Sequence, residues 1–289
     1  MLTWHVIVLA AVQGLAELLP ISSSAHVVVA EKLMGMDPSA PQMTLLLVML
    51  HTGTMLAVII YFWRQWREAF FSSSKTFWEF AWLLTLATGI TGVLGEGLVK
   101  LIEKVWLRGT PDAEVEQLFS HLELIAPALA LVGILILVSG AFKKRGPHPE
   151  ASESIGLNAR QASIIGIVQA FCLPFRGFSR SGATISTGML AGVAKIRAEQ
   201  FSFALAVGLT PAVDAREALR LLRFEQAGGT ETIAVALLPS LLGALCAFLA
   251  GLLALKWLSK WLEGGRWYLF GIYCLLAAAV VAFLHVKGF

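Results

Sequence analysis

Apolar residues run through this chain in long stretches that carry few charges, and these stretches recur from one end to the other. Each approaches or exceeds the roughly 20 residues that an α-helix needs to cross the hydrocarbon core of a bilayer. The pattern therefore predicts transmembrane helices. The six predicted spans lie at about 42–63, 77–101, 122–142, 199–222, 232–257 and 267–286.

Two further apolar regions, at about 3–36 and 158–196, are interrupted near the middle by polar residues. Pro20 and Pro174 each precede a cluster of serines, and the segments on either side are too short to cross a bilayer alone. Broken backbone at membrane depth is tolerated where protein buries it or where it lines a wet cavity. We therefore predict that both regions form re-entrant helical hairpins.

The order of these elements repeats, because each half of the chain holds one broken hairpin followed by three spans. Three is an odd number, so the second copy enters the membrane in the opposite direction. We predict an all-α polytopic membrane protein with an inverted-topology repeat, in which the broken helices of both halves meet near the midplane. A single membrane domain would cover residues 1–289, with repeat one at about 1–145 and repeat two at about 155–289.

The composition agrees with a membrane protein, since 57% of the residues are hydrophobic, 14% are charged and the mean hydropathy is +0.75. The net charge of +3 is small, and the distribution of charge indicates topology, not a nucleic-acid partner. With both termini outside, the inner segments hold 12 Lys and Arg residues and the outer segments 8, with the two arginines of the second serine cluster set aside. This excess modestly favours that orientation. The three cysteines are interpreted as small core residues.

The first break begins with Gln13 and Glu17, which are spaced i, i+4 and so project from one face of a helix toward Pro20. A carboxylate beside a hydroxyl cluster suits a general base or a metal ligand. It equally suits a structural glutamate that bonds the exposed backbone amides of the break. Both interpretations of Glu17 stay open at this point.

Ser22, Ser23 and Ser24 follow the break where a second half-helix should begin, and His26 comes two residues later. Serine is a favoured N-cap, so one of the three hydroxyls has an ordinary structural explanation. Three in a row exceed what capping needs, and a helix N-terminus also binds anions. Together with Glu17, these residues permit a nucleophile, a base and an orienting acid.

The second break supplies positive charge. Arg180 lies between Ser179 and Ser181, ahead of Gly182, at the start of the next half-helix. Backbone amides, hydroxyls and a guanidinium at a helix N-terminus make a cradle for phosphate, which arginine contacts in a bidentate way. A snorkelling arginine, or one paired structurally with Glu17, is the alternative, but it leaves the surrounding hydroxyls unexplained.

His51 sits inside a predicted span and could line the same cavity as the two polar breaks. A lone histidine at membrane depth is more often hydrogen-bonded to a neighbouring helix than catalytic. We therefore interpret His51 as structural.

At both breaks the chain resembles the bacitracin-resistance family of bacterial undecaprenyl-diphosphate phosphatases. That family has a Glu/Gln-x-x-x-Glu motif leading into Leu-Pro-(Val/Ile)-Ser-Ser-x-x-His, and a Gly-x-Ser-Arg-Ser-Gly-Ala-Thr motif in its second half. The matching positions here are Gln13 to Glu17, Leu19 to Ser23 with His26, and Gly177 to Thr184. The hydropathy between them is similar over nearly the whole length.

The resemblance implies a catalytic set of Glu17, Ser23, His26 and Arg180, which removes the terminal phosphate from a C55 polyprenyl diphosphate. It also implies a divalent cation, Mg²⁺ or Ca²⁺, near Glu17 and Gln13. The protein would be a multi-pass protein of the bacterial inner membrane with its site facing outward, and a homodimer is an arrangement that membrane proteins of this size commonly adopt. The residues expected to bind the diphosphate are Ser22, Ser24, Arg176, Ser179, Ser181, Gly182 and Thr184.

The chain departs from the family pattern at several positions. Gln13 stands where many members have glutamate, which removes one carboxylate from the expected metal site. Arg176 stands where proline is usual, and its charge could hold the second phosphate. Three further departures are Ala25 for glycine, Gln200 for glutamate and Gly208 for proline.

A secondary transporter or lipid flippase is the competing class, because inverted repeats with broken helices are its usual architecture. It leaves unexplained why a serine cluster with Glu17 and His26 should accompany an arginine flanked by serines. A purely structural membrane protein needs no such convergent polar groups.

Overall fold

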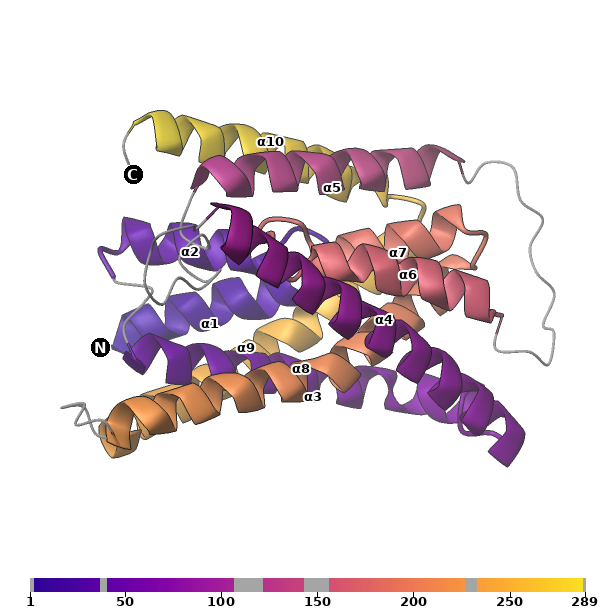
Figure 1. Cartoon of the computed structure of the whole chain (residues 1–289), viewed down its shortest axis with the longest axis horizontal. Helices are drawn as coiled ribbons and strands as arrows, with labels where there is room; N and C mark the ends of the chain where they lie inside the picture. Colours follow the sequence, from indigo (N-terminus) through magenta and orange to yellow (C-terminus); the bar gives the residue numbers. More distant parts are fainter. Residues whose placement is uncertain (1–2, 37–40, 107–121, 143–155, 227–232, 288–289) are drawn as a thin grey trace. The chain divides into compact units, whose positions relative to one another are not determined.

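The structure is a computed structural model that describes residues 3–36, 41–106, 122–142, 156–226 and 233–287. Every regular element in these ranges is an α-helix, which confirms the predicted all-α class (Figure 1). The helices are α1 (Thr3–Leu18), α2 (Ser23–Leu33), α3 (Pro41–Ala69), α4 (Ser74–Trp106), α5 (Leu122–Phe142), α6 (Ala159–Phe171), α7 (Arg180–Leu190), α8 (Lys195–Gln226), α9 (Ile233–Glu263) and α10 (Tyr268–Val286).

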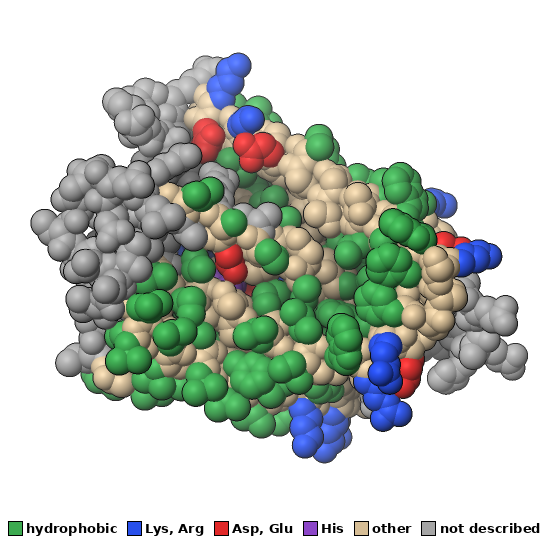
Figure 2. Space-filling model, turned by 90° about the horizontal axis from the view of Figure 1, so that it is seen from below, with side chains coloured by type: hydrophobic (Ala, Val, Ile, Leu, Met, Phe, Trp, Pro, Cys, Tyr) green, Lys and Arg blue, Asp and Glu red, His purple; other side chains and the backbone are tan. Residues whose placement is uncertain are grey.

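Within the described ranges, five helices are long and apolar enough to cross a membrane. The segments are Leu45–Ala69, Ser74–Val105, Leu122–Ala141, Leu237–Leu262 and Tyr268–Val286. They carry large apolar side chains at exposed positions, such as Trp78 and Leu238. Figure 2 shows apolar side chains over much of the visible face, with Lys and Arg near its margins. Apolar surface of this extent marks a lipid-facing protein, and the chain is a multi-pass membrane protein.

The predicted span at 199–222 lies in α8 and is not among these five segments. The first half of α8 is apolar, whereas several charged residues lie between Asp214 and Arg223. Charges at membrane depth are costly, which explains why this helix differs from the others. The sixth span and the re-entrant course of the hairpins stay predictions.

The chain divides into two compact units. Unit 1 comprises Met1–Leu19, Ser23–Trp63 and Ala206–Leu258, and unit 2 comprises Pro20–Ser22, Arg64–Leu205 and Ser259–Phe289. Helices α3, α8 and α9 pass from one unit into the other. The arrangement of one domain with two repeats stays a prediction.

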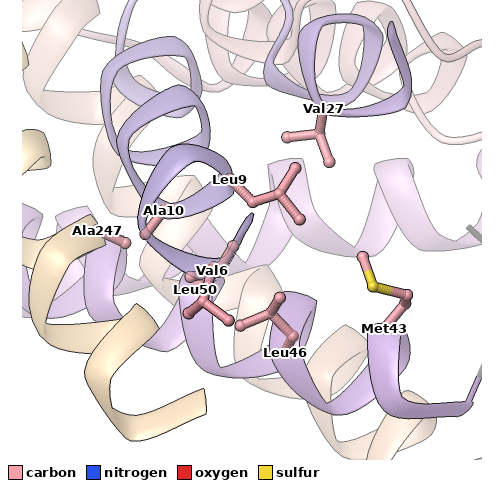
Figure 3. Packing of buried hydrophobic residues seen from close by; sticks show 8 residues of the cluster. All are labelled: Val6, Leu9, Ala10, Val27, Met43, Leu46, Leu50 and Ala247. Carbon is pink, nitrogen blue, oxygen red and sulfur yellow. The ribbon is translucent and has the colours of Figure 1, made fainter. Parts of the chain in front are cut away.

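Unit 1 has a core of apolar side chains from α1, α2, α3 and α9. Leu9, Leu46 and Leu50 are fully buried there, and Val27 of α2 contributes to the same cluster (Figure 3). Figure 3 also shows Ala247 of α9 beside α1. This packing holds α1, whose C-terminal end carries the first polar motif.

Small residues let the helices of unit 1 approach closely. A Cβ atom on Gly14 of α1 would lie 2.6 Å from the Ala247 carbonyl oxygen of α9. A Cβ on Gly53 of α3 would likewise overlap the Ala244 carbonyl. Close backbone approach at small residues is how membrane helices associate. It holds α1 and α3 firmly against α9.

Unit 2 is built from paired helices. Helix α5 lies alongside α10, and α6 packs against both α4 and α7 (Figure 1). The buried Trp267 donates its indole N–H to the hydroxyls of Ser139 on α5, at 3.1 Å, and of Ser186 on α7, at 3.3 Å. Thr91 of α4 donates to the Gly166 carbonyl of α6 at 3.0 Å. These contacts fix α7, whose N-terminal end carries the second polar motif.

The start of α8, also in unit 2, is held by polar and aromatic contacts. The Arg197 guanidinium lies 5.8 Å from the centre of the Phe70 ring and donates to the Gln200 side-chain oxygen at 3.1 Å. Partial burial lowers the pKa of Arg197. Phe201 is buried on the next turn, and Ser202 follows it. The position of Ser202 matters for the second motif.

Candidate active site

The first hairpin breaks between Leu18, where α1 ends, and Ser23, where α2 begins. Ser22 has a φ of 67°, in the left-handed region that side chains other than glycine rarely adopt. Strained backbone of this kind is held in place only by its surroundings, and it is common at functional sites. The break turns the chain so that Ser23 faces back toward α1.

Glu17 is the centre of the polar cluster in unit 1, and 12% of its side chain is exposed. Its Oε2 accepts hydrogen bonds from the Ser23 hydroxyl and, at 3.1 Å, from the Gln13 amide. The structure thus brings together three predicted site residues. A partly buried carboxylate that accepts a hydrogen bond from a serine hydroxyl is the arrangement that a general base requires. We call Gln13, Glu17, Ser23 and His51 the Glu17 cluster.

His51 of α3 completes this cluster. Its Nε2 lies 3.8 Å from Glu17 Oε2, and its Nδ1 lies 2.9 Å from the Leu47 carbonyl oxygen. Because a carbonyl can only accept, Nδ1 carries the proton of that hydrogen bond. The hydrogen bond of His51 stays within α3, while its other nitrogen faces Glu17 of the neighbouring α1, so a structural role for His51 stays a prediction.

The remaining polar residues of the first motif lie next to Ser23 in the sequence or within three residues of it. Ser24 and His26 lie on the first turn of α2 and are partly buried, while Ser22 is buried and belongs to unit 2. Their roles in binding and catalysis stay predictions.

The second hairpin breaks between Phe171, where α6 ends, and Arg180, where α7 begins. Ser179 is the N-cap of α7, and its hydroxyl oxygen accepts from the Gly182 backbone N–H at 3.2 Å. Its oxygen also lies 3.4 Å from the Ser181 hydroxyl. Ser179 therefore has a structural role as a cap, in addition to the phosphate-binding role that the sequence predicts.

The loop of this break is fixed by Gly177, whose φ of 101° is accessible mainly to glycine. A Cβ at this position would lie 2.6 Å from the Ile125 carbonyl oxygen of α5. The loop therefore rests directly on the backbone of α5. Arg176, one residue earlier, is partly buried.

Arg180 is held in unit 2 through Ser202 and Thr184. Its Nη1 donates to the Ser202 carbonyl oxygen at 3.4 Å, and its own carbonyl accepts from the Thr184 hydroxyl at 2.7 Å. The Thr184 and Ser202 hydroxyls lie 2.6 Å apart and are buried. We call Ser179, Arg180, Ser181, Thr184 and Ser202 the Arg180 cluster. Thr184 thus has internal partners, and its contact with phosphate stays a prediction.

The Pro20–Ser22 segment, which precedes Ser23 in the chain, packs within unit 2. The Pro20 carbonyl accepts from the Cys274 thiol at 3.4 Å. A Cβ on Gly182 would lie 3.1 Å from the same carbonyl oxygen. Gly182 therefore provides space for this backbone, which is a packing reason for glycine at that motif position.

Comparison with known proteins finds matches that span both motifs. The family model described as bacitracin resistance protein BacA matches residues 6–280. The chain belongs to the BacA family. It is 58% identical over 280 residues to undecaprenyl-diphosphatase 2 of Acinetobacter baylyi, covering 96% of each chain. It is 34% identical over 284 residues to undecaprenyl-diphosphatase 1 of Burkholderia pseudomallei, covering 95% of this chain and 94% of the relative.

The BacA-family motifs led to Glu17, Ser23 and Arg180, whereas sequence reasoning favoured a structural role for His51 and missed Ser202. His51 lies on a helix separated from α1 by α2 and a loop, and Ser202 lies beyond α7. The placement of histidine inside an apolar span was a usable signal for His51. The polar Ser202 between Phe201 and Phe203 gave only a weak one.

The donor set around Glu17 can be compared with what a metal ion needs. No three His, Cys, Asp or Glu side chains come together in the part of the chain that the structure describes. Glu17 supplies a carboxylate, Gln13 an amide and His51 an imidazole nitrogen. Such a set fits an ion that takes its remaining ligands from water and substrate phosphate, as Mg²⁺-type ions often do.

Proposed function

We propose that this BacA-family chain hydrolyses undecaprenyl diphosphate to undecaprenyl phosphate and inorganic phosphate, which recycles the lipid carrier of cell-wall synthesis. The observation that carries the proposal is the hydrogen bond from the Ser23 hydroxyl to the partly buried Glu17 carboxylate at the helix break. The names of the relatives support the same reaction. The first motif provides a hydroxyl and a carboxylate, and the second provides an arginine at a helix N-terminus. These are groups that cleavage of a phosphoanhydride can use.

The Arg180 cluster binds the diphosphate in this proposal. Helix α7 presents its N-terminal amides there, and Arg180 adds a guanidinium that can contact two phosphate oxygens. Arg176, Ser181, Gly182 and the hydroxyls of Ser22, Ser24 and Thr184 are further contacts that the motif suggests. The prenyl tail remains in lipid between helices.

The Glu17 cluster carries out the proton chemistry. Glu17 takes the proton of Ser23, or of a water that Ser23 orients, as the new bond to the terminal phosphorus forms. The bond from that phosphorus to the bridging oxygen breaks, and undecaprenyl phosphate leaves. If water attacks, inorganic phosphate forms in the same step; if Ser23 attacks, a water then cleaves the phosphoserine, which releases inorganic phosphate and restores the Ser23 hydroxyl. Arg180 stabilises the charge on the phosphoryl group in transfer, where most catalysis of this reaction originates. His26 serves as the proton shuttle to the leaving group.

A divalent cation, Mg²⁺ or Ca²⁺ on the family resemblance, assists the reaction in this proposal. Glu17 and Gln13 would hold it together with substrate oxygens. When bound, such an ion neutralises phosphate charge and makes phosphorus easier to attack.

The membrane arrangement completes the proposal. We infer six spans with α8 as the sixth, two re-entrant hairpins and an inverted-topology repeat. The protein lies in the bacterial inner membrane with its site open to the outside, where the carrier lipid is released. Assembly as a homodimer belongs to the same proposal.

Phosphate release from a C55 prenyl diphosphate by the purified protein in detergent tests this function. We expect release that continues without any ion gradient and falls when a chelator is added. C55 prenyl monophosphate, which lacks the phosphoanhydride bond, serves as the control substrate. Tight binding of the diphosphate without any release, under every divalent ion tried, would instead support a transporter or flippase.

A further inference from the structure

One contact of the Glu17 cluster has no role in the mechanism above. His51 Nε2 lies 3.8 Å from Glu17 Oε2, although the two residues belong to different helices. We propose that His51 is a ligand, with Glu17, of the divalent cation, and that it makes this site bind Zn²⁺ more tightly than Mg²⁺ or Ca²⁺. The inference rests on the proposed function for the presence of a cation and adds a ligand and an ion preference to it.

The distance between the two atoms suits a shared ion. Metal bonds to imidazole nitrogen and carboxylate oxygen are about 2.0–2.2 Å long, so two ligands of one ion lie roughly 3 Å apart at a right angle and about 4 Å apart when opposite. The 3.8 Å separation falls in this interval. It is too long for a direct hydrogen bond.

The other side of the His51 ring has the partner that a metal ligand normally has. Metal-bound histidines almost always donate their second ring N–H to a carboxylate, a backbone carbonyl or water, which fixes the tautomer. Here Nδ1–H donates to the Leu47 carbonyl at 2.9 Å, one turn earlier on α3. The lone pair of the neutral ring is therefore on Nε2, which faces Glu17.

The helix around His51 is well held. Thr54 donates its hydroxyl to the His51 carbonyl at 2.8 Å, and Gly53 packs on the backbone of α9. Ligands mounted on rigid helices keep their geometry when an ion binds. Gln13 and Ser23, which also surround Glu17 Oε2, can add oxygen ligands to the same ion once the Gln13 amide turns its oxygen inward.

The composition of this donor set decides the ion preference. Ca²⁺ takes six to eight oxygen ligands, whereas imidazole nitrogen favours later first-row ions. Gln13 gives the site one carboxylate fewer than the Glu-x-x-x-Glu version of the motif, and His51 adds a nitrogen. Both differences move the preference away from Ca²⁺ and toward Zn²⁺.

Metal binding is measured on the full chain in detergent, purified through a tag without histidine and stripped with chelator. Co²⁺ serves as the first probe because its visible absorption reports nitrogen ligands. We expect the wild type to bind Co²⁺ at least about tenfold more tightly than His51→Ala, with Ca²⁺ affinity changed less than about twofold. The matched control is His285→Ala, since His285 Nδ1 also lies near a carboxylate, 3.5 Å from Glu123 Oε2, at an exposed position.

A second measurement needs no variant, and so does not depend on how His51→Ala folds. Pulsed electron paramagnetic resonance of Mn²⁺ bound to the wild type should show coupling to a nitrogen nucleus. Equal Co²⁺ affinity in the wild type and a folded His51→Ala, or Mn²⁺ bound without nitrogen coupling, overturns the inference. Nitrogen-coupled metal binding without phosphate release would leave this inference intact and count against the proposed function alone.

Discussion

The two broken hairpins share one sequence plan and use it differently. In the first, Gln13 donates to Glu17, four residues later, at 3.1 Å. In the second, the corresponding Gln169 donates to the Thr91 hydroxyl of α4 at 3.3 Å, and the residue four positions later is Leu173. A Cβ on Gly95 of α4 would overlap the Leu173 side chain, so this position serves packing.

The difference extends to the second half-helix of each hairpin. Helix α7 begins with a capped N-terminus that carries Arg180, whereas α2 begins with Ser23 directed at a carboxylate. One hairpin therefore holds a negative group with a hydrogen-bonded hydroxyl, and the other a positive group at a helix N-terminus. In the proposed function, the first takes part in proton chemistry and the second in anion binding.

The largest effect should come from Arg180→Ala. If the second hairpin supplies the positive charge for phosphoryl transfer, turnover falls by about 10³-fold or more, because such arginines contribute on that scale. Initial rates of phosphate release measure it, with thermal unfolding in detergent as a check of folding. Arg160→Ala, an exposed position on α6 of the same hairpin, is the control and should retain turnover. Near-normal release by Arg180→Ala would falsify the assignment.

Glu17→Gln and Ser23→Ala test the first hairpin. Each should lower turnover by about 10²-fold or more, since a positioned general base contributes 10²–10⁴-fold. Because the two residues are hydrogen-bonded, the double variant should lose little more than either single variant. The same phosphate assay measures all three, and Glu68→Gln, at an exposed ion pair with Arg64, is the control. Additive losses would mean that the two side chains act independently.

Gln13→Leu and Gln169→Leu compare the two copies directly. Gln13 bonds a carboxylate, so its loss should lower kcat/KM by about tenfold, the equivalent of a hydrogen bond to a charged group. Gln169 bonds a neutral hydroxyl of α4, so its replacement should change kcat/KM less than about twofold. Steady-state kinetics of both variants decide this. Equal losses would show that the copies have not diverged in role.

The smallest effect is expected at Ser179. Ser179→Ala removes the N-cap of α7 and should lower the free energy of unfolding by about 1 kcal/mol. Ser179→Asn, which keeps a capping oxygen, should restore most of it. Denaturation in mixed detergent measures the difference, and turnover is followed in parallel. Loss of turnover in Ser179→Asn at restored stability would show that the hydroxyl also contacts substrate.

Much of the fold could be predicted because its signals are local. Long apolar stretches correspond to α3, α4, α5, α9 and α10, all of which carry candidate spans. The prolines and serine clusters marked both helix breaks at nearly the right residues. The fourth predicted span was harder to judge, because α8 combines an apolar first half with a charged second half.

The candidate site was only partly predictable. The i, i+4 spacing of Gln13 and Glu17 indicated a shared face, and the structure confirms their contact. The hydrogen bond between Ser23 and Glu17 depends on the turn at Ser22, whose left-handed φ no serine preference would suggest. The internal partners of Thr184 depend on α8, which lies outside the motif.

The sequence by itself determined that this chain is helical, crosses a membrane and carries two related polar breaks, because hydrophobicity and helix-breaking residues act over neighbouring positions. Only the tertiary structure decided that His51 faces Glu17 and that Ser202 holds Arg180. Those contacts join separate helices, and their register depends on where small residues such as Gly14 and Gly53 let backbones approach. In a membrane, lipid is as apolar as the helix faces, so hydrophobic pattern alone does not select one pairing over another.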